Sequence, residues 1–311
     1  MTTLLFTHPD CRAHLTPPGH PEQVARLAAV EEALAAAEFS SLRRAEAPLA
    51  DIAEITRCHP PEYVEAIRGA LPRQGIASLD ADTHVSPGSF DAARRAVGGA
   101  IAATGAVLEG RAGNAFVACR PPGHHAETAR PMGFCLFGTV AIAAKHALQR
   151  HGLSRVAVID FDVHHGNGTQ DLLWNEGRAF FASSHQMLLF PGSGATDETG
   201  ACGNVLNVPL APETAGAEMR RAYEGEILPA VEDFAPGLIL VSAGFDAHRA
   251  DPLAQLHWST DDFIWLTERI CDVADRVCAG RIVSTLEGGY DLDALGESVA
   301  AHLRVLMERG R

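Results

Sequence analysis

Residues 156–169 read Val-Ala-Val-Ile-Asp-Phe-Asp-Val-His-His-Gly-Asn-Gly-Thr. The first four are apolar and mostly β-branched, which predicts a buried strand. Asp160, Asp162 and His164 then alternate with apolar residues, and residues two apart on a strand point to the same side. The stretch therefore predicts a strand whose carboxyl end aims two carboxylates and an imidazole at one side, just before a glycine-rich loop.

Apolar strand patterns alternate with helical patterns along most of the chain. We expect strands at residues 3–7, 115–120, 155–162, 179–184, 205–210, 238–243 and 282–286, and helices at about 21–39, 90–108, 134–151, 213–234, 259–279 and from 292 onward. Ser259 is expected to cap its helix, with Asp262 three residues on and Gly280 after the end. Such alternation is typical of a parallel sheet covered by helices on both faces. No linker, repeat or low-complexity run interrupts it, so we expect one α/β domain over residues 1–311.

The composition limits the kinds of partner. Lys and Arg number 25 and Asp and Glu 39, which gives a formal net charge of −14. This balance argues against a nucleic-acid groove or an anionic membrane surface as the main partner. No signal-peptide pattern opens the chain, and no apolar run approaches the roughly 18 residues of a membrane helix. The seven cysteines are scattered without a C-x-x-C pair, which indicates reduced thiols and a cytoplasmic protein.

Polar residues follow five of the predicted strands, at their carboxyl ends. They are His124 and His125; Asp160, Asp162 and His164; Ser183 and His185; Asp246; and Tyr290. In open α/β sheets ligands bind at this edge. Five apolar strands that all end in such residues predict a shared site.

Asp162, His164 and Asp246 are the candidate metal ligands. Two carboxylates and one imidazole, with a fourth position left open, are typical of a catalytic zinc site. The same ligands also suit Fe(II), Co(II) or Mn(II). An isolated Asp-x-His is more often a capping or salt-bridge pair, and the second aspartate after another apolar strand is what favours the metal.

The adjacent His124 and His125 could serve as the base and the acid that hydrolysis at a metal requires. Asp160 is the expected partner of one imidazole and Asn167 that of the other. Tyr290 follows Gly288 and Gly289, where the backbone can approach a site closely, and its phenol could stabilise an oxyanion. A His-His pair in a loop or a half-buried tyrosine in a turn also occurs without any catalytic role.

Taken together, several motifs resemble the histone deacetylase family, the zinc-dependent branch that also includes acetylpolyamine amidohydrolases. They are Arg120-Pro-Pro-Gly-His-His-Ala126, Gly133-Phe-Cys135, Asp160-Phe-Asp-Val-His-His-Gly-Asn-Gly-Thr169, Ser242-Ala-Gly-Phe-Asp246 and Glu287-Gly-Gly-Tyr290. The resemblance extends over nearly the whole chain, including His20-Pro-Glu22 and His59-Pro-Pro-Glu-Tyr63. The residue types at Asn167 and Glu287 are closer to those of class II members and their bacterial relatives.

The resemblance implies an arginase/deacetylase fold around an eight-stranded parallel sheet. It implies zinc on Asp162, His164 and Asp246, with His124 and His125 as acid–base groups and Tyr290 polarising the substrate carbonyl. It also implies a structural potassium ion beside the zinc, held through residues of two strand ends: Asp160, Asp162, His164, Ser183 and Ser184.

The family's substrate tunnel maps onto further positions. Phe134 and Phe190 match its aromatic walls, and the Gly133 carbonyl matches the acceptor of the substrate amide. Asp82 matches the rim aspartate that grips the substrate backbone, and Gly288 is expected beside the substrate. Leu253 stands where polyamine-selective relatives have an acidic residue.

Two departures from the family pattern stand out. Gly138-Thr139 replaces the asparagines expected after Gly-Phe-Cys-Leu-Phe, a change expected on the helix side. The segment 186–191 is shorter than in eukaryotic members, which would widen the tunnel mouth. Neither departure removes a catalytic group.

These observations favour removal of acetyl or other acyl groups from acyl-lysine side chains of a peptide or protein, by zinc-activated water. Small acetylated amines such as acetylpolyamines are the rival substrates, and a non-catalytic acyl-lysine binding module is the alternative from another class. A ureohydrolase of the same fold would need a second metal and a further aspartate where this chain has Gly166. The physiological substrate, acyl-chain preference, metal in vivo and formation of a homo-oligomer stay open at this level.

Overall fold

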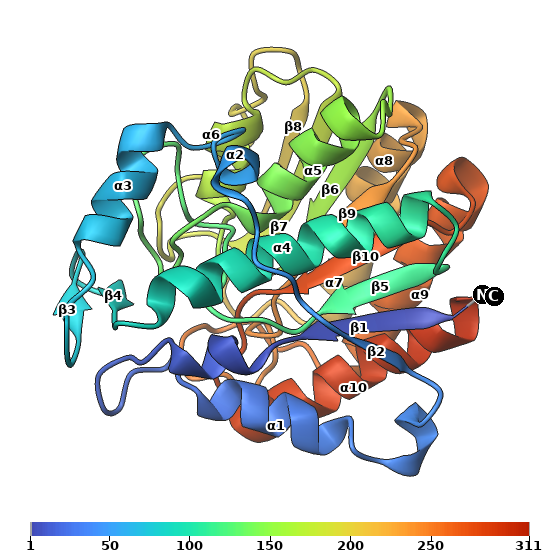
Figure 1. The fold of residues 1–311 in the computed structure, drawn as a ribbon. Coiled ribbons are helices and arrows are strands. Elements are labelled where there is room, and N and C mark those ends of the chain that lie inside the picture. The colour runs from blue at the N-terminus through green and yellow to red at the C-terminus, as the bar shows by residue number, and fades with distance from the viewer. Residues whose placement is uncertain (1, 311) are drawn as a thin grey trace.

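The computed structural model describes residues 2–310. It contains eight parallel strands in one sheet, in the order β2-β1-β5-β10-β9-β6-β7-β8 (Figure 1). Their bounds are Thr3–Thr7 (β1), Arg43–Glu46 (β2), Asn114–Val117 (β5), Val156–Asp160 (β6), Ala179–Gln186 (β7), Val205–Leu210 (β8), Ile239–Ala243 (β9) and Ile282–Leu286 (β10). A separate antiparallel hairpin joins Ala77–Ser78 (β3) to His84–Val85 (β4).

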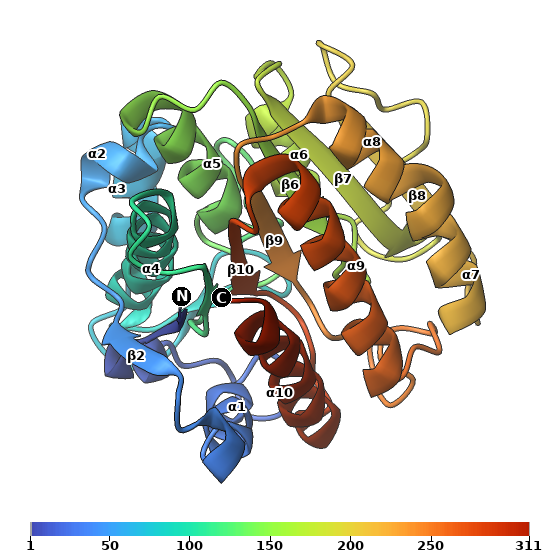
Figure 2. The same ribbon diagram turned by 90° about the vertical axis from the view of Figure 1, so that its right-hand side faces the viewer.

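Helices cover both faces of the sheet (Figure 2). On one face lie Ser89–Leu108 (α4) and Thr139–Arg150 (α5), and on the other lie Ala25–Ala33 (α1), Leu228–Phe234 (α8), Thr260–Cys278 (α9) and Leu292–Arg309 (α10). Shorter helices are Ile52–Ile55 (α2), Pro61–Gly69 (α3), Asn167–Leu173 (α6) and Gly216–Ala222 (α7), the last joined to α8 by a π-helical turn at Tyr223–Ile227. The three layers and the eight-stranded parallel sheet confirm the predicted fold.

The burial of the strands explains the sequence pattern. Every residue of β6, β9 and β10 is buried, as expected for parallel strands covered on both faces. β2 at the sheet edge reads Arg-Arg-Ala-Glu and is mostly exposed, so it carried no apolar signal and was not predicted.

Several predicted boundaries are confirmed and others are wrong. Ser259 and Asp262 form a capping box at the start of α9. The helix expected at 21–39 covers only α1, and a separate 3₁₀ turn lies at Ala37–Phe39. The helix expected from 134 begins at Thr139, because Gly133 and Phe134 both adopt positive φ angles, +54° and +69°, which an α-helix does not accept.

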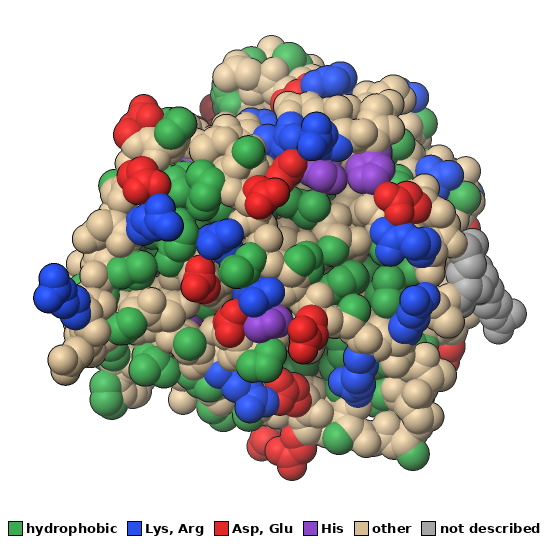
Figure 3. Space-filling model, viewed as in Figure 1, with side chains coloured by type: hydrophobic (Ala, Val, Ile, Leu, Met, Phe, Trp, Pro, Cys, Tyr) green, Lys and Arg blue, Asp and Glu red, His purple; other side chains and the backbone are tan. Residues whose placement is uncertain are grey.

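The surface over α4 carries both signs of charge. Lys and Arg side chains alternate with Asp and Glu side chains across this face (Figure 3). Ion pairs such as Arg57–Glu54 and Arg94–Asp91 belong to this mixture. Of the helices in residues 2–310, none combines the length and the apolar character that crossing a bilayer requires.

Candidate active site

Five consecutive strands of the sheet supply the polar residues predicted for the site. In sheet order they are β5, β10, β9, β6 and β7, which lead to His124 and His125, Tyr290, Asp246, the Asp160–His164 segment, and Ser183. Because the strands are parallel, their carboxyl ends meet at one edge. The strand order, which the sequence did not reveal, is what brings these five ends together.

Asp162, His164 and Asp246 converge as predicted. Nδ1 of His164 lies 3.0 Å from Oδ1 of Asp162 and 3.1 Å from Oδ2 of Asp246. All three side chains are buried. Within residues 2–310 this is the one set of three such side chains whose donor atoms lie within 4.8 Å of one another.

Backbone amides orient the two carboxylates. The N–H of Gly288 donates to Oδ2 of Asp162 at 2.8 Å, and the N–H of Val163 donates to Oδ1 of Asp246 at 2.9 Å. Burial and the charge of Asp162 raise the pKa of Asp246. Two buried carboxylates that share one imidazole suit a divalent cation, whose charge offsets their mutual repulsion.

The strand ends earlier than the alternation rule assumed. β6 stops at Asp160, and Asp162 and His164 lie in the loop that follows. Their common direction comes from the contacts just described and not from the two-residue repeat of a strand. Oδ1 of Asp160 accepts the N–H of Asp162 at 3.1 Å, which helps to shape this loop.

His124 and His125 lie beside the three candidate ligands, with ring centroids 3.9 Å apart. Nδ1 of His124 lies 3.0 Å from Oδ2 of Asp160, and Nδ1 of His125 lies 2.8 Å from Oδ1 of Asn167. Both predicted pairings are therefore present in the structure. Glu127 was not predicted, and it fixes the Asn167 amide by accepting its Nδ2–H at 2.8 Å.

The two imidazoles have opposite pKa shifts. Burial opposes protonation of His124, but the charges of Asp162 and Asp160 outweigh it and raise the pKa of His124 to about 10. Burial, followed by the positive charges of His124 and His164, lowers the pKa of His125 well below its usual range. Neighbouring titratable groups whose pKa values are driven apart are typical of acid–base sites.

Glu287 holds the turn that carries the histidine pair, a contact that was not predicted. Its Oε2 accepts the N–H groups of Gly123 at 2.7 Å and of His124 at 3.2 Å. Ser242 donates to its other oxygen at 3.2 Å. The buried glutamate thus joins the ends of β5, β9 and β10.

Tyr290 is held by two residues whose role the sequence did not reveal. Arg26, fully buried in α1, donates to the carbonyl oxygens of Gly289 at 2.6 Å and of Glu287 at 2.5 Å. Its guanidinium lies 4.9 Å from the centre of the Tyr290 ring. Asp251 accepts the N–H of Tyr290 at 2.7 Å and that of Leu253 at 3.0 Å.

A pocket of about 230 Å³ opens above these groups. Its lining includes residues predicted for the substrate site, and also Leu189, which was not predicted: Asp82, His125, Gly133, Phe134, His164, Leu189, Phe190, Leu253 and Tyr290. Gly288 lies below this lining, against the carboxylates of Asp162 and Asp246, where a Cβ would overlap both. Its contribution is the hydrogen bond to Asp162.

Of the predicted potassium ligands, Asp160 and Ser183 lie side by side at two neighbouring strand ends. Ser183 pairs with Asp160 in the register of β6 and β7. The hydroxyl of Ser183 lies 3.0 Å from Nδ1 of His185, and that of Ser184 lies 2.8 Å from the hydroxyl of Tyr223. Buried oxygen atoms at neighbouring strand ends are the kind of ligand a hard cation accepts.

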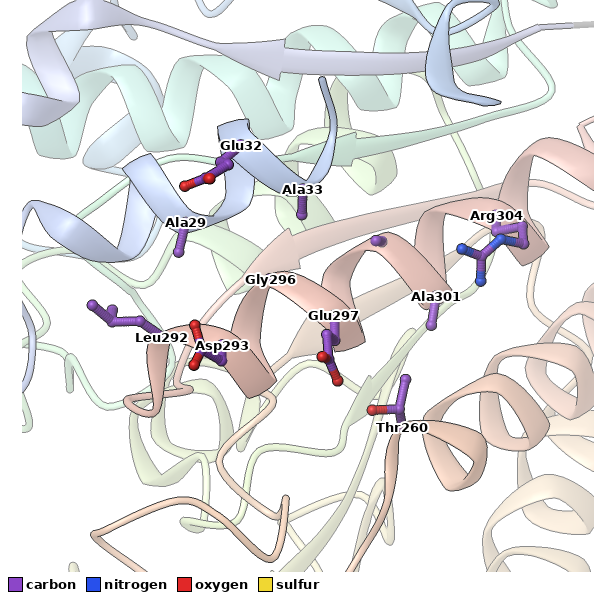
Figure 4. A pocket seen from close by; sticks show the side chains of 11 residues that line it. Ala29, Glu32, Ala33, Thr260, Leu292, Asp293, Gly296, Glu297, Ala301 and Arg304 are labelled. Carbon is purple, nitrogen blue, oxygen red and sulfur yellow. The ribbon is translucent and has the colours of Figure 1, made fainter. Parts of the chain in front are cut away.

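A larger groove lies elsewhere on the molecule, between α1, α10 and the start of α9 (Figure 4). Its volume is about 570 Å³, and Glu32, Asp293 and Glu297 line it above a floor of small residues. His, Cys and the candidate metal ligands are absent from its described lining. The smaller pocket, with its convergent titratable groups, is therefore the candidate active site.

Comparisons with known proteins agree with this site. The family model described as histone deacetylase domain matches residues 20–306. A histone deacetylase-like amidohydrolase of Pseudomonas aeruginosa is 44% identical over 80% of this chain and 66% of its own length. A probable deacetylase of Archaeoglobus fulgidus is 37% identical over 94% of this chain and 82% of its own. The crystal structure of the HDA15 HD domain is similar with a TM-score of 0.94 and 31% identity, covering 99% of this chain and 88% of that one.

Proposed function

This chain belongs to the histone deacetylase family of amidohydrolases, and we propose that it removes acetyl or other acyl groups from acyl-lysine side chains with a bound zinc ion. The observation that carries the proposal is the pocket floor. There His125, His164 and Tyr290 line one pocket, Asp162 and Asp246 contact the His164 ring from below, and the His124 ring packs against His125. Family membership supports a deacetylase activity. The identity of the substrate and that of the metal are what we propose.

Asp162, His164 and Asp246 would hold the zinc ion. A bound divalent ion supplies Lewis acidity to water and to the amide carbonyl. Fe(II) or Co(II) suits the same donors, so the metal used is to be measured. We further propose that potassium binds through oxygen atoms of the Asp160–His164 loop and of Ser183 and Ser184.

The chain's own groups move protons and stabilise charge. The neutral His125, held by Asn167, faces the pocket and is placed to donate a proton to the leaving amine after it has received one. His124 is paired with Asp160, whose carboxylate favours the protonated form of this imidazole beside the reacting centre. The Tyr290 hydroxyl is placed to donate a hydrogen bond to the substrate oxygen as that oxygen becomes an anion.

The pocket lining favours acyl-lysine over small acetylated amines. Leu189, Phe190 and Leu253 are apolar, and Asp82 contributes the one carboxylate of the lining. An apolar wall suits the methylene stem of lysine, whereas a polyamine would bring a further cationic nitrogen to this wall. The lining of the pocket therefore suits a substrate with a long neutral stem, such as that of acyl-lysine.

Turnover of an acetyl-lysine peptide should be compared with that of N-acetylputrescine, using zinc-, iron- and cobalt-loaded protein. We expect the larger kcat/KM with the peptide. Fast turnover of the amine beside negligible turnover of the peptide would replace our substrate by the rival.

A non-catalytic acyl-lysine binding module is tested by one pair of variants. Tyr290→Phe should lower kcat by about 10²- to 10³-fold if the phenol stabilises the oxyanion. Tyr63→Phe removes a buried hydroxyl that donates to the Leu136 carbonyl at 2.7 Å, away from the pocket, and should leave kcat unchanged. Metal-loaded wild-type protein that binds acyl-lysine but cleaves nothing would favour the binding module.

The compartment and the assembly state are separate proposals. The cytoplasmic location predicted from cysteine usage stays a prediction, to be checked by cell fractionation. Whether the chain forms a homo-oligomer is a question for light scattering.

A further inference from the structure

The turn of the β3–β4 hairpin lies against the pocket and is fixed by its own side chains. Oδ1 of Asp80 accepts the N–H groups of Asp82 at 3.0 Å and of Thr83 at 2.7 Å. The N–H of Leu79 donates to the Thr83 carbonyl at 2.8 Å. An aspartate that accepts two amides in this way makes a rigid turn, so Asp82 and Thr83 hold fixed positions.

Thr83 connects this turn to the aromatic wall of the pocket. It is fully buried. The Thr83 hydroxyl donates to Oδ1 of Asp82 at 2.8 Å. The hydroxyl oxygen of Thr83 also accepts the N–H of Phe134 at 3.2 Å. One hydroxyl thus contacts both the rim carboxylate and the backbone of the wall residue.

Phe134 needs such support because its backbone conformation is unfavourable. Its φ angle is +69°, in the left-handed region that bulky residues rarely adopt. Gly133 before it is also left-handed, and a Cβ there would overlap the His125 ring. Strained residues keep their conformation only when surrounding contacts impose it, and Thr83 provides a hydrogen bond to the amide of this one.

The His20 ring makes a second contact with the same wall. The His20 ring packs edge-on against the Phe134 ring, with centroids 4.7 Å apart. Its Nε2 lies 3.0 Å from the Asp82 carbonyl oxygen. His20, Asp82, Thr83 and Phe134 therefore form one connected unit at the pocket mouth, which we name the rim unit.

We propose that Thr83 is a positioning residue for substrate binding, because its hydroxyl sets the Phe134 wall and the Asp82 carboxylate in one fixed relation. This inference rests on the proposed deacylase function and deepens it. Thr83 does not line the pocket, so it acts through Phe134 and Asp82 and not by contact with substrate.

The expected kinetic effect follows from where the rim unit lies. Phe134 and Asp82 are placed to contact the stem and the backbone of the substrate, away from the carbonyl that reacts. Such contacts are equally strong in the bound substrate and in the transition state, so their loss raises KM and leaves kcat nearly unchanged. A merely structural role would instead reduce the fraction of folded enzyme, and with it the apparent kcat at constant KM.

Thr83→Val is the test, with Thr83→Ser as its conservative partner. Valine keeps the shape of threonine but leaves the Phe134 amide without its acceptor and the Asp82 carboxylate without its donor. We expect KM for an acetyl-lysine peptide to rise about tenfold with kcat within about twofold. Thr83→Ser should restore KM, and the amide of Phe134 should exchange hydrogen faster in Thr83→Val than in Thr83→Ser.

Thr104→Val controls for the chemical change itself. Thr104 is buried in α4, and its hydroxyl has no hydrogen-bond partner among residues 2–310. This variant should match the wild type in KM and kcat. If Thr83→Val does not give folded protein, Thr83→Ala removes the same hydroxyl with less steric demand and is read in the same way.

Two results would overturn the inference. One is an unchanged KM in folded Thr83→Val, and the other is a KM in Thr83→Ser that rises as much as in Thr83→Val. Wild-type protein that cleaves no acyl-amide with a full metal complement would instead overturn the proposed function. Failure of the proposed function appears in the wild type, whereas failure of the inference appears only in the Thr83 variants, so the two failures are distinguishable.

Discussion

Oδ1 of Asn167 lies 2.8 Å from Nδ1 of His125. The amide nitrogen of Asn167 donates to Glu127, so the oxygen is the atom that faces the ring. His125 must then carry its hydrogen on Nδ1, which leaves Nε2 with a free lone pair in the neutral ring. An uncharged amide fixes the tautomer but stabilises the cation less than a carboxylate does, in contrast to Asp160 beside His124.

Asn167→Asp should raise the pKa of His125, since a carboxylate stabilises the imidazolium. If neutral His125 is needed for activity, the acidic limb of the kcat/KM–pH profile moves to higher pH by about one unit. Glu127 would repel the new carboxylate, so the variant is best combined with Glu127→Gln. Glu127→Gln alone should leave the limb in place, and an identical limb in the double variant would contradict the assigned role.

Asp246→Asn should lower the amount of metal bound. The amide cannot supply the negative charge that, with Asp162, balances a divalent ion. We expect purified wild-type protein to carry about one zinc per chain and the variant much less, measured by elemental analysis after dialysis. Asp293→Asn, in the groove of Figure 4, makes the same chemical change away from the site. Full metal content in Asp246→Asn would remove Asp246 from the ligand set.

Leu253→Glu should shift the substrate preference. A carboxylate at this position of the lining would attract the free ammonium group of N-acetylputrescine and would repel acidic side chains of a peptide. We expect kcat/KM to rise for the amine and to fall for the acetyl-lysine peptide. Leu188→Glu adds the same charge on a side chain that is 92% exposed and lies outside the described lining. An equal shift in both variants would show that overall charge, and not position 253, sets the preference.

His302 should make stability depend on pH. The ring is buried between the hydroxyls of Thr267 and Ser284, at 2.8 and 3.0 Å, and burial lowers its pKa to about 3. In the unfolded chain a histidine binds its proton near pH 6.5, so between these values the unfolded state holds one proton more. The contribution of His302 to the free energy of unfolding should therefore be constant above about pH 6.5. Below that pH the contribution should fall by about 1.4 kcal/mol per pH unit.

His302→Asn removes this titration. Urea unfolding at several pH values between 7 and 4 should give a shallower slope in the variant than in the wild type. Equal slopes would mean that the ring is protonated in the folded protein. The variant is expected to be less stable at pH 7, because asparagine fills the space between the two hydroxyls less well.

Local sequence patterns determined most of the elements and the chemistry of the site. The apolar runs predicted β8 and β10 with their observed bounds, and Ser259 with Asp262 predicted the start of α9. Asp162, His164 and Asp246 were predicted from donor type and strand position. Such signals are local, because burial, capping and donor chemistry are properties of a few adjacent residues.

Long-range contacts were decided by the tertiary structure alone. Arg26 donates to Gly289 and Thr83 accepts from Phe134, and no local pattern links either pair. The common direction of Asp162 and His164 comes from loop contacts after β6 has ended. The sheet order, which sets β5, β10, β9, β6 and β7 side by side, depends on packing across the whole chain. The sequence thus determined which groups carry the chemistry, and the tertiary structure determined which residues hold them in place.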